Sequence, residues 1–505
     1  MPERTIAICG CGAPAREHPR RPVQPGEFKG EKTIQKTGTK RDYLTMLIEN
    51  LNSAPSTLAK CDDKELSWQQ QQPILRFEIH RPASSNFGIP ASLLHEAFGQ
   101  FSDTFQSDQY ELDANDFYFT AKFCRAMCKV YAGKKGEGAR RDVANALISE
   151  YIKLELTPRK TYNGGTSETD GTLFALLGQT VWSVPILISE IKTEIGSGGC
   201  DPTIEGLAYY MWSVTKGLSA QGATYAREYS VMPLLLLSIV GPNVSFSFLA
   251  NGATILMDPA TPFFSCLFLP FDIPQMTKVA RAFRAMKDCI ENLTRYYHNL
   301  SFSAIKNPHF EQLSFPYCNS FTYDGSQILF EYERQIGNTL VFVANTITAH
   351  QSISQNTSIV VKFTRTYSKE AHQICFSYQA SAPQLYSFGR LKGGWYVIIM
   401  ESLEGFSSYN PACYYLNDSL KAIVGNLHSQ DFVHGDLRGC NILVNPTSFP
   451  PRICLIDFDW SGKEDSTRYP AFMNHSDVDW ADGASDFLPL KKAHDLHFLN
   501  SFVMI

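Results

Sequence analysis

Apolar residues recur every three or four positions through much of residues 90–155, which predicts amphipathic helices there. Further along, the pattern changes to short runs rich in Val, Ile, Leu and Phe, which predict β-strands. A helix-like stretch at 202–218 interrupts these runs, and a longer one at 275–300 follows them. Residues 46–305 are therefore expected to form an α/β domain, preceded by a disordered arm at 1–45 that lacks periodicity. The expected strands are 172–177, 184–195, 231–240, 244–250 and 263–271.

From about residue 320 the strand-like runs become shorter, and a single helix-like segment separates them into two groups. This order is typical of a two-lobed nucleotide-binding fold, with lobes at about 320–402 and 403–505. The fold class expected for this domain, 315–505, is α+β, and 306–310 is a linker. The expected strands are 327–336, 339–346, 358–366 and two within 382–405, and the expected helices are 369–379 and 416–433.

The composition, 44% hydrophobic and 19% charged, is that of a globular protein, and 505 residues favour two or three domains. With a net charge of −5, the chain lacks the overall basicity that is typical of nucleic-acid-binding proteins. The 13 cysteines are scattered, and Cys9/Cys11 and Cys124/Cys128 lack a second pair at zinc-site spacing, which favours a reducing, intracellular compartment, cytoplasmic or nuclear. With no signal-like run, and an apolar block at 231–242 too short for a bilayer, no membrane is expected.

Two short segments carry residues that suit phosphoryl transfer. His434, Asp436 and Asn441 lie close together in the first, and Asp457 ends an apolar run in the second. In such a reaction a carboxylate meets the acceptor hydroxyl, while an amide oxygen and a second carboxylate can hold magnesium. A cation must also steady the nucleotide phosphates.

The sequence HGDLRGCN at 434–441 resembles the catalytic loop of protein kinases, and DFD at 457–459 resembles their metal-binding DFG segment. The resemblance implies that Asp436 accepts or orients the proton of the acceptor hydroxyl. Arg438 lies where many kinases carry a Lys that steadies the transferring phosphate.

The same resemblance implies ATP and Mg²⁺ as cofactors, with Asn441 and Asp457 as the metal ligands. Lys362, in the segment SIVVK, matches the strand lysine that holds the nucleotide phosphates. Glu370 is placed to pair with that lysine from the next helix, and Glu401 lies where the hinge would meet the adenine.

The chain is similar to the fungal-type protein kinases, whose members carry a VVKF…EAH…AP…HGDLR..NI(L)…IDFDW…RYP…HD pattern. Residues 463–480 and 493–500 continue the likeness, and Asp495 matches an Asp that braces the catalytic loop. The likeness covers about 320–505. It implies a protein serine/threonine kinase that moves the γ-phosphate of ATP to a hydroxyl of an unidentified protein substrate.

Several positions depart from the kinase pattern. Gly435 replaces the Arg that would pair an activation-loop phosphate, so control by loop phosphorylation is not expected. Asp459 replaces the Gly of DFG, and Gly337 is the only glycine of the loop expected over the phosphates. No A-P-E segment is present and few residues follow Asp495, so a shortened second lobe is expected. Two alternatives stay open: a small-molecule kinase of the aminoglycoside or choline type, and a pseudokinase scaffold.

A second candidate site lies in the α/β domain. Glu190 and Lys192 are two apart on an expected strand, so both side chains leave one face, and Asp170 precedes the strand before. This order resembles the PD-(D/E)xK nuclease core, in which carboxylates bind magnesium and the Lys stabilises charge as water attacks a phosphodiester. Glu150, on the preceding helix, is the expected additional acidic ligand.

Crinkler-type proteins combine such nuclease-like modules with kinase-like ones, and nucleic acid is expected as a partner only through this domain. The alternatives are a solvent-facing strand edge for Glu190 and Lys192, a simple turn at Asp170, or a partner-binding platform on the helix at 201–210.

Overall fold

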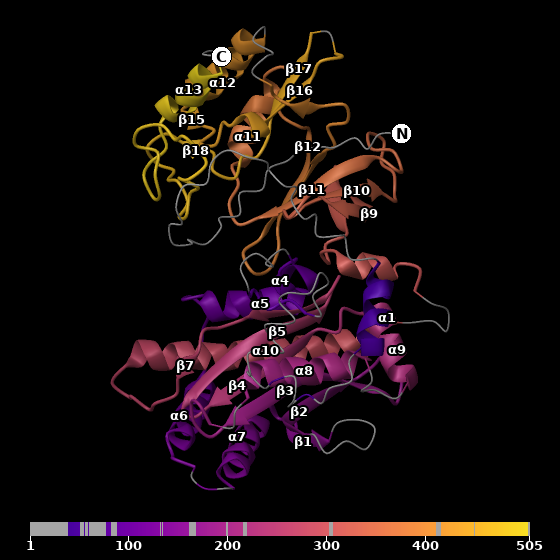
Figure 1. Ribbon diagram of the computed structural model, residues 1–505, viewed down its shortest axis with the longest axis vertical. Helices are drawn as coiled ribbons and strands as arrows, with labels where there is room; N and C mark the ends of the chain where they lie inside the picture. Colours follow the sequence, from indigo (N-terminus) through magenta and orange to yellow (C-terminus); the bar gives the residue numbers. More distant parts are fainter. Residues whose placement is uncertain are drawn as a thin grey trace, which may run out of the picture. The chain divides into compact units, whose positions relative to one another are not determined.

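The computed structural model describes residues 39–50, 55, 59, 77–81, 88–131, 133, 135–160, 168–197, 200–215, 220–301, 307–410, 416–448 and 450–502. These divide into two units, the first ending at Cys318 and the second beginning at Asn319 (Figure 1). The expected disordered arm lies outside the described residues up to position 38. Its last part is helical, because α1 (Lys40–Asn50) buries Tyr43 and Leu47 against the first unit.

A seven-stranded sheet forms the centre of the first unit, and its neighbouring strands pair antiparallel except β3 and β4, which run parallel. The predicted strand at 263–271 is wrong beyond its first residues, because Leu267, Leu269 and Phe271 are exposed and leave the sheet. The strands are β1 (Thr157–Lys160), β2 (Glu168–Leu176), β3 (Ser183–Lys192), β4 (Leu234–Val240), β5 (Asn243–Asn251), β6 (Ile255–Pro259) and β7 (Phe264–Ser265), of which β7 pairs with β5.

The central strand β3 is buried along its length after Ser183, as its nearly continuous apolar run requires. The helix α8 (Pro202–Thr215) packs against β3 and β4, and α10 (Ile273–Asn299) packs against β2, β3 and β4. Because β3 and β4 are parallel, the chain must cross over between them, and α8 and α9 (Ala220–Tyr229) form this connection. The crossover brings polar residues of β3 next to α8.

The helical spacing at 90–155 corresponds to four helices that precede the sheet. The second and third of them pack on α10, where Phe119 and Phe123 meet Phe283 at ring-centroid distances of 5.0 and 4.7 Å. These helices are α4 (Ala91–Leu94), α5 (Glu96–Gln106), α6 (Ala114–Met127) and α7 (Gly136–Ile152), and a 3-10 turn, η2 (Phe310–Ser314), follows α10.

The second unit begins with a six-stranded antiparallel sheet in the order β12-β13-β11-β10-β9-β8. Val341, Val360, Ile398 and Met400 form an apolar cluster on this sheet. The strands are β8 (Ser320–Tyr323), β9 (Ser326–Gln335), β10 (Val341–Thr346), β11 (Ser358–Thr364), β12 (Leu385–Arg390) and β13 (Tyr396–Glu401).

The rest of the second unit is mainly helical with short strand pairs, so the unit as a whole is a mixed α+β structure consistent with a kinase-like fold. Leu420, Val424 and Leu427 of one helix pack with Leu437 and Phe458 in a second apolar core. The elements are α11 (Lys369–Ser377), β14 (Ser407–Ser408), α12 (Asn417–Ser429), β15 (Phe432–Val433), η4 (Gly439–Asn441), β16 (Ile442–Asn445), β17 (Arg452–Leu455), β18 (Gly462–Lys463) and α13 (Lys492–Ser501).

In the portion of the chain that the structure describes, none of the helices combines the length and the apolar character that crossing a membrane requires.

Candidate active site

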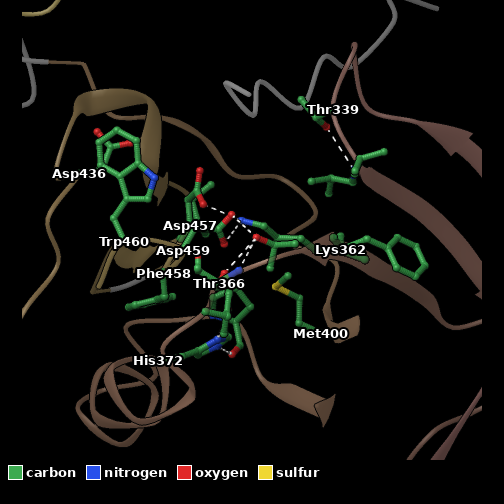
Figure 2. Close-up of a pocket in the computed structure, with 18 of the residues that line it drawn as sticks. Thr339, Lys362, Thr366, His372, Met400, Asp436, Asp457, Phe458, Asp459 and Trp460 are labelled. Carbon is green, nitrogen blue, oxygen red and sulfur yellow. Dashed lines mark hydrogen bonds and ion pairs between the residues drawn. The ribbon is translucent and has the colours of Figure 1, made fainter. Parts of the chain in front are cut away.

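A cavity of about 540 Å³ in the second unit collects side chains that are far apart in the sequence (Figure 2). Its walls come from β10, β11 and β13 on one side and from the segments after β15 and β17 on the other. Lys362, Glu401, Asp436, Asp457 and Asp459 all line it. The predicted positions of the strand lysine, the catalytic loop and the DFG-like segment therefore meet in one place.

Lys362 lies in the middle of β11, in register with Val341 of β10 and Ile398 of β13. Its Nζ lies 2.6 Å from Oδ1 of Asp457 and 2.6 Å from Oδ1 of Asp459. Burial alone would lower the pKa of Lys362, but these two carboxylates raise it above its ordinary value. The lysine is therefore a fixed cation held between two acidic side chains.

The two carboxylates that hold Lys362 have different environments. Asp457 has φ 66°, a left-handed conformation that is uncommon outside glycine and concentrates at functional sites. Burial opposes ionisation of Asp457, but Lys362 lowers its pKa below the ordinary value. Burial raises the pKa of Asp459 to about 6, although Lys362 opposes this, and the Thr364 hydroxyl donates to its Oδ2 at 2.9 Å. Asp457 is thus the more acidic member of the pair.

The predicted ion pair between Lys362 and Glu370 is wrong for this structure. Both residues are described, and Glu370 is exposed in the first turn of α11 while Lys362 contacts the two aspartates. The helix instead turns His372 inward, where its ring stacks on Phe458 at 4.8 Å. Because neighbouring helix positions face different directions, burying His372 turns Glu370 outward.

Asp436 is buried and receives hydrogen bonds from two other predicted site residues. Arg438 Nε and Nη2 donate to its two carboxylate oxygens at 2.5 and 2.7 Å. Asn441 Nδ2 donates to the Asp436 carbonyl and to Oδ2, both at 2.9 Å. The amide nitrogen of Asn441 is therefore turned toward Asp436, so its oxygen is the atom that a cation could meet.

The predicted brace at Asp495 is confirmed. Its carboxylate accepts hydrogen bonds from the backbone of His434 at 2.8 Å and of Gly435 at 3.0 Å, and His428 Nε2 lies 2.9 Å from it. Gly435 has φ 83°, and a Cβ there would lie 3.2 Å from Leu490 and from the Trp460 carbonyl. The backbone of the loop therefore favours glycine, and any side chain there would be strained.

Two further predicted residues lie at or beside the cavity. Gly337 has φ 55° in the turn between β9 and β10, next to the cavity-lining Asn338 and Thr339. Glu401 ends β13, and both of its oxygens pair with Arg452, at 2.8 and 2.9 Å. Their roles in holding ATP stay predictions.

A second polar cluster forms in the first unit from the nuclease-like residues. Asp170 of β2 accepts a hydrogen bond from the backbone of Ile191 at 2.8 Å, and Glu190 and Lys192 follow one another on that face of β3. Lys192 Nζ lies 2.9 Å from Oε2 of Glu205 on α8. Glu190 and Lys192 are buried, so the alternative of a solvent-facing strand edge is wrong.

The charged side chains of this cluster change one another's pKa. Burial raises the pKa of Asp170 to about 6, and burial together with Asp170 and Glu205 raises that of Glu190 well above its ordinary value. Glu190 is 2% exposed, and its Oε1 has no hydrogen-bond partner among the described residues. Lys192 is the cation of the cluster, and the carboxylates around it raise its pKa although burial opposes this.

The predicted acidic ligand Glu150 is wrong. Glu150 lies near the C-terminal end of α7, where its side chain is 55% exposed. Its carboxylate pairs with Lys122 at 2.6 Å. Glu137, in the first turn of the same helix, lies 3.8 Å from Lys192 instead. Glu205 was also missed, although an acidic residue in the first turn of a helix that follows β3 was a signal in the sequence.

Oxygen donors suit Mg²⁺ at both clusters, through Asp457, Asp459 and Asn441 in one and Asp170 and Glu190 in the other. The unpartnered Oε1 of Glu190 is the kind of buried atom that a cation would satisfy. Over the described part of the chain, however, no three His, Cys, Asp or Glu side chains are grouped to hold a metal ion. In both clusters a lysine ammonium supplies the positive charge.

No family model matches the sequence, and no curated protein matches it. Three kinases are among the solved structures that are similar to part of the chain. The Cydia pomonella granulovirus kinase PK-1 is 17% identical over 28% of this chain and 55% of that one, with a TM-score of 0.23. The Rad53 kinase domain with SCD2 in complex with AMPPNP is 16% identical over 26% and 51%, with a TM-score of 0.20.

Vaccinia related kinase 3 is 14% identical over 36% of this chain and 64% of that one, with a TM-score of 0.26. The chain thus spans between about half and just under two thirds of the length of these kinases. TM-scores this low do not support an assignment of function. Such an assignment depends on the residues that line the cavity.

Proposed function

We propose that the second unit is a fungal-type, two-lobed protein kinase that transfers the γ-phosphate of ATP to a Ser or Thr hydroxyl. One observation carries the proposal: Lys362, Asp436 and Asp457, separated by up to 95 positions, line the same cavity. The order strand lysine, loop aspartate, second aspartate matches the parts that phosphoryl transfer needs.

Each residue then has a role set by its surroundings. Asp436, held by Arg438 and Asn441, accepts or orients the proton of the acceptor hydroxyl. Lys362 holds the nucleotide phosphates after exchanging a carboxylate for them. Asn441 and Asp457 would hold Mg²⁺, which when bound neutralises charge on the phosphates.

The test is incorporation of γ-labelled phosphate into the purified chain and a mixed set of basic proteins with Mg²⁺ present. Asp436→Ala is expected to lose roughly 10²- to 10⁴-fold of the activity, the usual contribution of a positioned acid or base. Asp418→Asn, an exposed position on α12, is the matched control and should retain full activity. Equal labelling by Asp436→Ala and the control would contradict the proposal.

Two other outcomes identify the alternatives. Labelling of an aminoglycoside or amino alcohol without label on protein would assign a small-molecule kinase. ATP binding without transfer to any acceptor would assign a pseudokinase scaffold.

A second candidate function, for the first unit, is a nuclease-like activity of the crinkler type on nucleic acid. The observation that favours it is the gathering of Asp170 with the buried Glu190 and Lys192 in one cluster, with an unpartnered Glu190 oxygen. Mg²⁺-dependent cleavage of a plasmid or an RNA, lost in Glu190→Ala and kept in the exposed Glu150→Ala, would support it. No cleavage by the unsubstituted protein would favour a partner-binding platform.

A further inference from the structure

Three cysteines of the first unit lie together although 138 positions separate Cys128 from Cys266. Cys124 and Cys128 are one helical turn apart at the C-terminal end of α6, and Cys266 follows β7. The Cys128 thiol donates to the Cys266 carbonyl at 3.3 Å, and its sulfur accepts from the backbone N–H of Phe268 at 3.1 Å. The helix end and the segment after β7 are therefore joined at the sulfur atom of Cys128.

The three thiols differ sharply in their access to solvent. Cys124 and Cys266 are fully buried, whereas Cys128 is exposed. A hydrogen bond with the Cys124 thiol, and then burial, raises the pKa of Cys266 well above its ordinary value, so Cys266 is not the thiol that reacts first. A reagent from solvent therefore meets Cys128 first.

Two chemical roles can be compared for such a cluster. A structural zinc site needs four ligands, and in the described residues no three His, Cys, Asp or Glu side chains are grouped to hold a metal. An exposed thiol beside a buried partner is instead the arrangement of a site that oxidises reversibly. The sulfur of Cys128 also accepts a hydrogen bond from the backbone N–H of Phe268, which fixes its position beside Cys266.

We propose that Cys128 and Cys266 form a thiol pair that a hydroperoxide oxidises to a disulfide. In the first step the Cys128 sulfur attacks the peroxide, an S–O bond forms, the O–O bond breaks, and alcohol or water leaves with the thiol proton. In the second step the Cys266 sulfur attacks the Cys128 sulfenic acid, an S–S bond forms, the S–O bond breaks, and water leaves with the Cys266 proton.

The hydrogen bond from the Cys128 thiol to the Cys266 carbonyl, at 3.3 Å, holds the two residues side by side. The disulfide would require their Cα atoms to lie about 4.4 to 6.8 Å apart and the Cys266 thiol to turn from Cys124 toward Cys128. The bond would fasten the end of α6 to the segment that leads into α10. It depends on neither proposed activity, since it uses none of their residues.

The test treats the full chain with increasing hydrogen peroxide, blocks remaining thiols with N-ethylmaleimide, and maps peptides by mass spectrometry without reduction. A peptide linking Cys128 to Cys266 is expected, and dithiothreitol should remove the link. Cys128→Ser should abolish the link, and Cys200→Ser, a partly exposed cysteine of the same unit, should leave it unchanged.

A second measurement needs no substitution. Without peroxide, iodoacetamide should label Cys128 faster than Cys124 or Cys266. The proposal is overturned if Cys266 forms its disulfide at an unchanged rate in Cys128→Ser, if peroxide takes Cys128 to the sulfinic acid with no link, or if Cys266 is alkylated before Cys128.

Discussion

Both units bury a lysine among carboxylates, but the carboxylates differ in their access to solvent. Asp457 and Asp459, which hold Lys362 at the cavity, are 20% and 23% exposed. Beside Lys192, the Glu205 side chain is 10% exposed, and Glu190 is 2% exposed. A ligand could therefore replace the partners of Lys362 from the cavity, whereas the nearest partner of Lys192, Glu205, is a largely buried residue of α8. The first arrangement suits exchange of the partners of its lysine, and the second is expected to make the larger contribution to the stability of its unit.

The largest effect is expected for Lys192→Met. Removing this cation leaves Glu205 buried without its partner, which should lower the free energy of unfolding by roughly 3–5 kcal/mol. Urea denaturation measures the loss, and hydrogen exchange should localise it to β3 and α8. Lys129→Met, at an exposed position, is the control. A loss below about 1 kcal/mol in Lys192→Met would mean that the Lys192 ion pair is as weak as a surface ion pair.

The pH dependence of the first unit should follow from Asp170, whose pKa is raised to about 6 by burial from an ordinary 3.8. Asp170 binds its proton more tightly in the folded protein than in the unfolded chain. It therefore contributes its full stabilisation of the folded state below about pH 4. That stability is lost as the pH rises through 6. The free energy of unfolding should fall by about 3 kcal/mol, because each pKa unit between 3.8 and about 6 corresponds to about 1.4 kcal/mol.

Urea denaturation of the chain between pH 4 and pH 7.5 measures this slope, and Asp170→Asn should flatten it. The same slope in the variant would mean that other groups cause it.

Lys362→Met should be less destabilising than Lys192→Met, by about 1–2 kcal/mol in total, because water in the cavity screens Asp457 and Asp459. Phosphate transfer should nevertheless be lost. Equal destabilisation by the two substitutions, measured in parallel urea titrations, would remove the distinction between the two clusters.

Asp459→Asn should tighten ATP binding by about 3- to 10-fold, a gain of roughly 1 kcal/mol. The substitution removes one of the two carboxylates that compete with phosphate for Lys362. Calorimetric titration with ATP measures the change, with the exposed Asp477→Asn as control. Weaker binding would instead show that Asp459 assists the nucleotide.

Glu190→Gln should change stability by less than about 0.5 kcal/mol, the smallest effect. Burial raises the pKa of the Glu190 carboxyl well above its ordinary value, which favours the protonated form, and glutamine has nearly the same shape as that form. Thermal unfolding at pH 7 tests this. A large gain in stability would mean that Glu190 is ionised in the folded state.

The sequence predicted the elements that carry strong local patterns, such as β3 and α10, and the cavity residues whose motif order is specific. It did not predict what packing between distant segments decides. The direction of Glu370 depends on His372 packing against Phe458, and the carboxylates beside Lys192 depend on how α7 and α8 meet β3. Local periodicity contains no such information.

The parallel pairing of β3 with β4 also has a kinetic consequence. Glu205 meets Lys192 only when α8, the first helix of the crossover, packs on β3, and the β3–β4 pairing that completes the crossover requires a long loop closure and therefore forms slowly. Until then each of these charges is hydrated separately. If their burial follows the folding transition state, changes at Lys192 should mainly alter the unfolding rate, so this cluster would set the lifetime of the folded unit rather than its speed of formation.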